Sequence, residues 1–372
     1  GRPVERREYL KNTTVILGAG ASFDSGVPMT SELSGRFLRR PPRSTVPKEV
    51  QDSITGTLED YWKRVFGWRR NLPRPPFEDH FTSLDLSANT GHNLGRGYPP
   101  SVLRVVRRFS IHRSFELLKP EPRSENWGIQ QLLAALLRVP GKNTVVSLNW
   151  DTVVEETLHQ VRRGWDYGVR MNRTGPAYYD DDRPLELLKL HGSRNWFYCD
   201  TCRRIYFGEP ESGDTVDRTG ILLRPADFQL TKAPRGALDA LRSWKKEGQV
   251  RCNNCRSELS ARVATFSYSK AFGFFQFDAV WERALQALRS SGRWIFIGYS
   301  LPEADFEFRH LLKTAQLASR RPSSPSIEVV LGGNRVDEEA ERYLRFFGKR
   351  VTEPHRKGLG PWAQEYLEEA SL

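Results

Sequence analysis

Four short polar segments each follow an apolar, strand-like run of this chain, and their residue types suit the binding of a nucleotide. In sequence order they are Gly18–Ser22 (Gly-Ala-Gly-Ala-Ser), Ser147–Asp151 (Ser-Leu-Asn-Trp-Asp), Leu190–Ser193 (Leu-His-Gly-Ser) and Gly298–Pro302 (Gly-Tyr-Ser-Leu-Pro). In an open α/β sheet the carboxyl ends of the strands meet at one edge, and ligands bind at that edge. We therefore expect the four segments to converge on one nucleotide site rather than to form four separate surface turns.

The first segment has the composition of a phosphate-binding loop. Gly18 and Gly20 leave backbone N–H groups unobstructed beside the N-terminus of an expected helix, a geometry that receives a pyrophosphate. The dinucleotide fingerprint is incomplete, because Phe23 stands at its third glycine position and no acidic residue ends a second strand about twenty residues further on. A tight turn without a ligand is the alternative for this loop.

All four cysteines occur as two Cys-x-x-Cys pairs, Cys199 with Cys202 and Cys252 with Cys255. Two such pairs in an intracellular chain are typical of a tetrahedral zinc site, and disulfides are the alternative. Four sulfur ligands leave no position for water, so we expect a structural zinc ion. The 49 residues between the pairs exceed the common spacing and predict a loop that bulges out of the zinc module.

Alternating strand and helix patterns surround these segments and indicate an α/β protein. Apolar or β-branched runs predict strands at Thr13–Leu17, Thr144–Leu148, Leu185–Leu190, Trp294–Ile297 and Ile327–Leu331. Proline boundaries and apolar residues at offsets of three and four predict helices at Pro28–Arg40 and around Ile129–Leu137, Val280–Leu288 and Ala340–Phe347.

Changes in composition divide the chain into parts. The α/β pattern covers residues 11–193 and 263–352, with a mostly helical insertion at 41–140 between the first two strands. Residues 194–262 are polar and contain all four cysteines, so we expect a separate zinc-ribbon module there. Residues 353–372 are expected to form a C-terminal tail.

Composition and charge narrow the class of protein. Of the 372 residues 38% are apolar, which is enough for a core. The sequence contains no run of eighteen apolar residues, which is the length needed to span a membrane. The charged N-terminal residues have no apolar segment behind them, so we expect a soluble, cytoplasmic protein without a membrane partner. The net charge of +12 is spread along the chain, so solvated faces explain it and nucleic acid is only a weakly supported partner.

Taken together and in this order, the four segments resemble the successive NAD contacts of the sirtuin family. Further matches are Ser25–Pro28 (Ser-Gly-Val-Pro) and the helical segment Pro76–Leu86, so the resemblance covers roughly residues 12 to 348. It implies a Rossmann-like, doubly wound parallel sheet that binds NAD as substrate, with a small zinc-carrying insertion. The Gly-Val-Pro turn, the Gly-Tyr-Ser-Leu-Pro segment and the acid Asp305 are similar to the prokaryotic sirtuin-like branch, many members of which consume NAD in antiphage defence.

Two departures from the sirtuin pattern argue against protein deacylation. Met29–Ser31 stands where deacylating sirtuins carry Asp-Phe-Arg. Those enzymes also carry Phe-Gly-Glu after the second cysteine pair, whereas Phe207–Glu209 precedes that pair here and Arg262–Ser267 occupies the expected place. The resemblance therefore implies an NAD glycohydrolase that releases nicotinamide and ADP-ribose. An NAD-dependent deacylase and a catalytically silent NAD- or ADP-ribose-binding module are the alternatives.

The resemblance also implies roles for the matching residues. Asn149 would position the attacking water or the nicotinamide amide, and His191 would act as general base, a task that suits histidine because its unperturbed pKa lies near neutral pH. The cofactor-binding residues implied are Gly18, Ala19, Gly20, Ala21, Ser22, Gly26, Pro28, Asp151, Gly298, Ser300 and Asn334. For Asn149, Asp151 and Asn334 a turn or a helix cap is the alternative.

The same branch implies that the activity is regulated, because an uncontrolled NAD hydrolase would kill its host. We expect the chain to form a homo-oligomer and to respond to a partner ATPase or to a phage-derived activator. The helical insertion at 41–140 is our candidate for the assembly surface.

Overall fold

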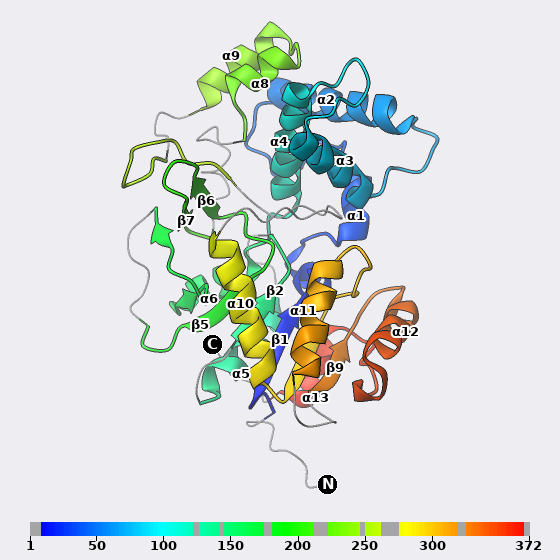
Figure 1. Cartoon of the computed structure of the whole chain (residues 1–372), viewed down its shortest axis with the longest axis vertical. Coiled ribbons are helices and arrows are strands. Elements are labelled where there is room, and N and C mark those ends of the chain that lie inside the picture. Colours follow the sequence, from blue (N-terminus) through cyan, green and yellow to red (C-terminus); the bar gives the residue numbers. More distant parts are fainter. Residues whose placement is uncertain are drawn as a thin grey trace.

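The computed structural model describes residues 9–121, 126–140, 144–174, 181–210, 222–245, 250–261, 275–318 and 325–367. Figure 1 shows two ends of the molecule: a group of helices at one end, and a parallel sheet with its covering helices at the other. Among the described residues, every helix is too short or too polar to cross a membrane.

Six strands form one parallel sheet in the order β3–β5–β2–β1–β8–β9. Their bounds are β1 Thr13–Leu17, β2 Thr144–Ser147, β3 Trp165–Asp166, β5 Leu185–Lys189, β8 Arg293–Ile297 and β9 Ser326–Val330. The chain adds β2 and β5 on one side of β1 and later adds β8 and β9 on its other side. This reversal defines a doubly wound sheet, and ligands of such sheets bind where the reversal occurs. The predicted fold class is confirmed.

The strand sequences reflect burial on both faces of the sheet. Every residue of β1, β2 and β5 is buried, including polar ones such as Thr14 and Glu186. Parallel strands covered by helices on both sides read as continuous apolar or β-branched runs rather than as alternating ones. This is the pattern that made the strands predictable from sequence.

Six of the described helices cover the sheet. They are α5 (Trp127–Arg138), α6 (Val153–Gln160), α10 (Phe275–Ser290), α11 (Phe306–Leu317), α12 (Val336–Phe347) and α13 (Leu359–Tyr366). The long helices α10 and α11 pack on each other in front of the sheet in Figure 1, and α5 packs on α6 and α13.

The remaining helices form what we call the helical lobe. They are α1 (Thr30–Arg36), α2 (Lys48–Phe66), α3 (Phe77–Thr90), α4 (Pro100–Leu117), α8 (Pro225–Leu230) and α9 (Arg235–Trp244). The first four lie between β1 and β2 in sequence, whereas α8 and α9 come from the segment between the cysteine pairs and pack on α4 and α2 (Figure 1). Arg108 of α4 donates a hydrogen bond of 2.8 Å to Asp227 of α8, which joins the two parts.

Helix α1 is shorter than the predicted helix Pro28–Arg40, because it spans only Thr30–Arg36. The guanidinium group of Arg113 contacts the chain just beyond this end. It donates hydrogen bonds to the carbonyl oxygens of Phe37 at 2.8 Å and Arg39 at 2.7 Å, so these groups have a partner outside the helix.

The cysteine-containing segment contributes two of the three short strands of a second sheet, and the third, β4 (Asn172–Arg173), precedes that segment. The order of this sheet is β4, β7 (Arg204–Phe207) and β6 (Trp196–Cys199), with β6 and β7 antiparallel. The Phe-Gly-Glu run that begins at Phe207 therefore continues from β7, and Gly208 donates a backbone hydrogen bond to Asn195. The segment 262–267, where deacylating sirtuins carry that run, lies outside the described residues.

Residues near the C-terminus, which the sequence predicts to be a tail, pack against the sheet. Residues 351–355 run parallel to β9 and form two isolated bridges with it, and α13 follows. Glu328 of β9 accepts hydrogen bonds from Tyr9 at 2.8 Å and from Trp362 at 2.7 Å. The first and last described parts of the chain therefore meet at one buried carboxylate.

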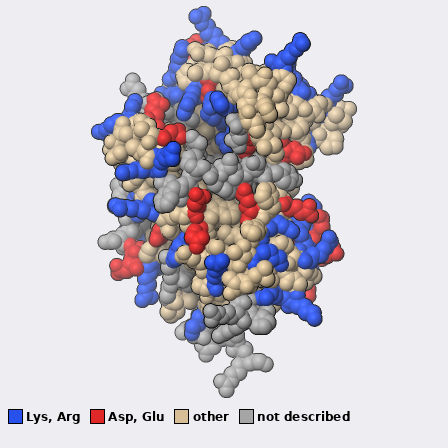
Figure 2. Space-filling view, viewed as in Figure 1, with Lys and Arg blue, Asp and Glu red and all other residues tan. Residues whose placement is uncertain are grey.

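Charged side chains of both signs are mixed over the face shown in Figure 2. Lys and Arg side chains appear at both ends of this face, with Asp and Glu side chains between them. Along the helices, neighbouring opposite charges form ion pairs, as in Arg64 with Asp60 at 2.8 Å and Arg345 with Glu341 at 2.8 Å. This face offers no continuous basic surface, so the net charge alone does not mark a binding region.

Candidate functional site

The register of the sheet brings the ends of five strands to one level. Leu17 of β1 pairs with Ser147 of β2 and with Ile297 of β8. The same level continues to Lys189 of β5 and to Val330 of β9. The polar segments that follow these strands consequently leave the sheet side by side, as the sequence analysis predicted from topology.

The glycines of the first and fourth segments allow two loops to touch. Gly20 donates a backbone hydrogen bond of 2.8 Å to the carbonyl of Gly298. A Cβ atom on Gly18 would lie 2.5 Å from the Cα of Tyr299, and one on Gly298 would lie 2.2 Å from the nitrogen of Ala21. Gly298 also has a φ of 62°, which favours glycine. Close packing of loop against loop therefore requires these glycines whether or not a phosphate binds.

The glycine loop enters a 3₁₀ helix, η2 (Ala19–Ser25), rather than the α-helix expected from the sequence. Gly26 ends it in the left-handed conformation, with a φ of 75°, and donates to the carbonyl of Phe23. Ala21 and Ser22 are buried, whereas Ala19 and Gly20 are partly accessible. The accessible backbone of the loop is therefore that of residues 19 and 20, at the start of a short, tight helix.

Asn149 is held against the glycine loop through its amide nitrogen. Nδ2 donates to the carbonyl of Gly18 at 2.9 Å and lies 3.3 Å from the hydroxyl of Ser22. These bonds fix the amide plane and direct the carbonyl oxygen Oδ1 away from the glycine loop. The side chain is only partly buried, so Oδ1 suits an interaction with a ligand.

His191 joins the second, third and fourth segments. Its Nδ1 lies 3.1 Å from the carbonyl oxygen of Leu148, and its Nε2 lies 3.8 Å from Oδ1 of Asp305. The other oxygen of Asp305 accepts a hydrogen bond of 3.0 Å from Tyr299, the residue after Gly298. Burial, and then the charge of Asp305, raise the pKa of Tyr299 well above its usual value, so its hydroxyl stays protonated and donates.

Together these contacts form a closed circuit around the carboxyl edge of the sheet. The glycine loop contacts Gly298 and Asn149, the neighbour of Asn149 contacts His191, and His191 contacts Asp305, which returns through Tyr299 to Gly298. The indole Nε1 of Trp281 adds a hydrogen bond of 3.0 Å to the carbonyl of Leu190 and so fixes the chain before His191.

A buried ionic cluster supports this edge from behind. Lys189, two residues before His191, pairs with Glu155 of α6 at 3.3 Å and donates to the backbone carbonyl of Asp151. Tyr167 donates to Glu155 at 3.1 Å. Burial raises the pKa of Glu155, and the positive charge of Lys189 opposes that rise. This cluster fixes the spacing between the second and third segments.

The remaining predicted binding residues differ in their surroundings. Asp151 is buried and accepts a hydrogen bond from the backbone nitrogen of Val153 at 3.1 Å, a local contact at the start of α6. Pro28 is buried and Gly26 lies against Glu121, where an added Cβ would come within 2.2 Å of its side chain. The structure therefore gives these three residues contacts with the protein itself.

Ser300 and Asn334 lie on the far side of β1 from Asn149. The carbonyl of Ser300 accepts a hydrogen bond of 2.6 Å from Arg342 of α12, and Asn334 is exposed in the turn before α12. Both follow strands at the carboxyl edge, as predicted.

Sequence reasoning did not select Tyr299, Trp281 or Lys189 as site residues. The only available signal was proximity in sequence, because Tyr299 lies within the fourth segment and Lys189 ends the strand before His191. Trp281 falls within the helix that the sequence predicts around Val280–Leu288. Its indole nitrogen donates to the carbonyl of Leu190, a residue 91 positions earlier in the sequence.

The four cysteines form one cluster. Their sulfur atoms all lie within 4.8 Å of one another, and those of Cys199 and Cys255 are 3.5 Å apart. Sulfur ligands about 2.3 Å from a tetrahedral zinc ion lie about 3.8 Å from each other. The backbone nitrogen of Cys202 also donates to the sulfur of Cys199 at 3.3 Å, which favours the thiolate form. Donor type, number and spacing therefore fit a structural zinc ion with no open position.

Comparison with known proteins gives structural neighbours only. No family model and no curated protein matches the sequence. Among solved structures, a Sir2 homologue mutant in complex with ADP-ribose covers 97% of this chain and 93% of its own, at 14% identity and a TM-score of 0.42. A complex of Sir2 with a p53 peptide and NAD+ covers 97% of both chains, at 13% identity and a TM-score of 0.38. At these identities the similarity concerns the fold alone.

Proposed function

We propose that this chain is an NAD glycohydrolase, which cleaves the bond between nicotinamide and ribose to give nicotinamide and ADP-ribose. The observation that carries the proposal is the circuit of contacts at the carboxyl edge of the sheet. It brings Asn149 and His191, an amide and a base, beside a glycine loop at the reversal of strand order. This is where open α/β sheets bind nucleotides.

Cleavage of the nicotinamide–ribose bond requires a group that orients the substrate or water and a group that accepts a proton. Departure of nicotinamide leaves an oxocarbenium-like centre on the ribose, as in other glycoside cleavage. Asn149, through Oδ1, can orient a polar group of the substrate or a water molecule. His191 can accept a proton at Nε2, because its Nδ1 faces a carbonyl oxygen and therefore carries the other proton.

The proposal includes a biological role that rests on the sequence resemblance to the prokaryotic branch. In that role the chain is a regulated effector that depletes NAD in antiphage defence. It works as a homo-oligomer, and a partner ATPase or a phage-derived component activates it. The four-cysteine cluster stabilises the module that contributes α8 and α9 to the helical lobe.

Product analysis separates the proposal from its alternatives. NAD is incubated with the purified protein, at low and high protein concentration, with and without an acetyl-lysine peptide, and the products are separated by chromatography. We expect nicotinamide and ADP-ribose without the peptide, and loss of both products in His191→Ala. Formation of acetyl-ADP-ribose only with the peptide would instead identify a deacylase. Tight NAD binding with intact NAD in every condition would identify a binding module.

A further inference from the structure

The end of the glycine loop contacts a segment that leaves the helical lobe. Glu121, which follows helix α4, donates a backbone hydrogen bond of 2.8 Å to the carbonyl oxygen of Ser25, the last residue of η2. The Glu121 side chain lies over the next residue, Gly26, because a Cβ atom on that glycine would come within 2.2 Å of Cγ of Glu121. The exit of the lobe and the end of the glycine loop are therefore in direct contact.

The glycine loop needs support at this end. η2 spans Ala19–Ser25, and 3₁₀ helices longer than about four residues are uncommon because their hydrogen bonds have poor geometry. The last carbonyl groups of a helix also lack partners within the helix. Glu121 supplies a donor to Ser25 and so holds the end of η2, whereas the accessible backbone of the loop lies at its start, at Ala19 and Gly20.

Arg43 holds the segment that contains Glu121. Its Nη1 donates to the carbonyl oxygen of Pro120 at 3.0 Å, and its Nη2 donates to that of Lys119 at 3.3 Å. Nη2 also lies 3.7 Å from Oε1 of Glu121, but the two side chains are 39% and 61% exposed, so this ion pair contributes little. The two hydrogen bonds to carbonyl groups therefore fix the position of residues 119–121.

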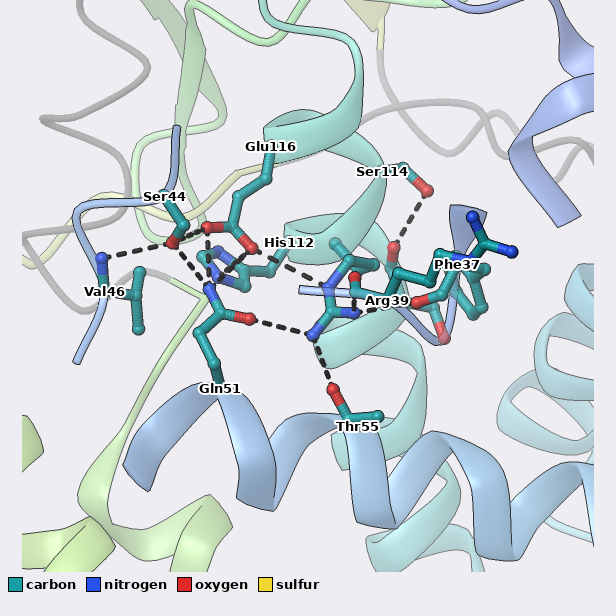
Figure 3. A network of polar contacts seen from close by, with 11 residues as sticks. Phe37, Arg39, Ser44, Val46, Gln51, Thr55, His112, Ser114 and Glu116 are labelled. Carbon is teal, nitrogen blue, oxygen red and sulfur yellow. Dashed lines mark hydrogen bonds and ion pairs between the residues drawn. The ribbon is translucent and has the colours of Figure 1, made fainter. Parts of the chain in front are cut away.

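Arg43 is itself anchored in the helical lobe by its neighbour Ser44. The Ser44 hydroxyl donates to the carboxylate of Glu116 on α4 and accepts a hydrogen bond of 2.7 Å from Gln51 of α2 (Figure 3). A continuous series of contacts consequently runs from α2 and α4 through Arg43 and Glu121 to the end of the glycine loop.

We propose that Arg43 is a positioning residue for NAD binding, which acts through Glu121 on the end of the glycine loop; this inference rests on the proposed function. While residues 119–121 are held against Ser25 and Gly26, η2 keeps the form in which the N–H groups at its start can meet a pyrophosphate. Release of the segment leaves the Ser25 carbonyl without this donor and weakens η2 from its end. The conformation of the helical lobe thereby sets the affinity of the site for NAD.

Such a coupling acts in both directions. If the contact of Glu121 strengthens NAD binding, NAD strengthens that contact by the same factor, because both effects belong to one thermodynamic cycle. NAD should therefore slow the hydrogen exchange of the Glu121 amide, which is the donor of the bond to Ser25. A residue that only stabilised the lobe would leave the Kd for NAD unchanged.

The test compares Arg43→Ala with a matched control, Arg40→Ala, which removes an exposed arginine from the same part of the lobe. Three quantities are measured on the full chain: the Kd for NAD by calorimetry, kcat and KM for nicotinamide release, and the hydrogen exchange of the Glu121 amide with and without NAD. Glu121→Pro is a second variant, because proline lacks the N–H group that donates to Ser25.

We expect Arg43→Ala to raise the Kd for NAD about tenfold, because two hydrogen bonds from a charged donor no longer hold the segment. KM should rise in parallel while kcat changes less than about threefold, the pattern of a residue that affects binding and not the chemical step. Exchange of the Glu121 amide should become about tenfold faster in Arg43→Ala, and NAD should slow it in the wild-type protein. Glu121→Pro should raise the Kd as Arg43→Ala does, and Arg40→Ala should change none of the three quantities.

Two results would overturn the inference while leaving the proposed function in place: a Kd of Arg43→Ala within about twofold of the wild-type value, or exchange of the Glu121 amide that does not respond to NAD. NAD binding by the wild-type protein without nicotinamide release would contradict the glycohydrolase function, whereas the Kd and exchange measurements would still decide the role of Arg43. Failure of the wild-type protein to bind NAD would contradict both.

Discussion

Two clusters of polar side chains, one in the helical lobe and one at the carboxyl edge of the sheet, differ in what surrounds their charged groups. In the lobe, Figure 3 shows the carboxylate of Glu116 among Ser44, Gln51 and His112. Arg113 beside it donates to two backbone carbonyls and, at 2.8 Å, to Gln51. Its side chain and that of Glu116 are 0% and 4% exposed, so protein groups alone surround both charges.

At the sheet edge the contacts are one-sided. Asn149 uses its amide nitrogen on the glycine loop and is only partly buried, and His191 uses Nδ1 on a carbonyl while Nε2 faces Asp305 at 3.8 Å. The protein orients Asn149 from one side, and Oδ1 of its partly buried side chain is suited to a ligand. The comparison teaches that polarity and burial alone do not mark a site, whereas a partly accessible polar group that the protein holds from one side, such as Asn149, is a candidate.

The largest effect that we predict concerns stability in the helical lobe. Arg113→Met should lower the free energy of unfolding by about 3 kcal/mol, because it leaves the buried carbonyl oxygen of Phe37 and the part-buried one of Arg39 without this donor and Glu116 without one neighbouring charge. Chemical denaturation measures this change. Arg104→Met, an exposed position on the same helix, is the control and should stay within about 0.5 kcal/mol. Equal effects of the two substitutions would contradict a specific role of the network.

A second prediction concerns the carboxylate of Glu116 in the same network. Burial alone would raise the pKa of Glu116, but the charge of His112 and hydrogen bonds from His112, Gln51 and Ser44 lower it to about 2. The folded-state pKa is thus below that of the unfolded chain, so the stabilising contribution is complete above about pH 4.5 and is lost as the pH falls towards about 2.

Denaturation of wild type and Glu116→Gln at about pH 6 and about pH 3 tests this prediction. The stability difference between the two proteins should shrink at the lower pH by about 1–2 kcal/mol. A difference that does not depend on pH would show that the carboxylate charge is not what stabilises the lobe.

Glu156, near the sheet edge on α6, should show the opposite dependence with a smaller effect. Burial raises its pKa to about 7, although the hydroxyl of Thr152 donates to it at 2.6 Å. Because the folded-state pKa is above that of the unfolded chain, this group costs stability as the pH rises from about 4.5 through about 7.

Glu156→Gln should therefore stabilise the protein by about 1 kcal/mol at pH 8 and leave its stability nearly unchanged at about pH 4. Glutamine keeps an oxygen for Thr152, so thermal denaturation at the two pH values isolates the charge. A loss of stability in Glu156→Gln at pH 8 would mean that the ionised group has a stabilising partner.

The sequence predicted the sheet and the convergence of its loops because these follow from local patterns. Apolar β-branched runs define strands, and the topology of a doubly wound sheet places the following residues, from Gly18 to Gly298, at one edge. The 3₁₀ form of the glycine loop, the early end of α1 at Arg36 and the contact between Asp305 and His191 did not follow. The last of these depends on side chains that meet across a long sequence separation, as Arg113 and Phe37 also do.

The same limit of prediction from sequence applies to the cysteine-containing segment. The spacing of the Cys-x-x-Cys pairs predicted one four-sulfur cluster and a long intervening loop. It did not predict that this loop supplies α8 and α9 to the helical lobe, because the contact of Arg108 with Asp227 joins residues 119 positions apart.

The most direct test of the account measures nicotinamide release by wild type, Asn149→Ala and Arg113→Met side by side, below the unfolding temperature of each protein. We predict that Asn149→Ala loses about 100-fold in rate at nearly unchanged stability, and that Arg113→Met keeps its rate within about threefold despite lower stability. Retention of the rate by Asn149→Ala, or its loss in a folded Arg113→Met, would contradict the assignment of the chemistry to the carboxyl edge of the sheet.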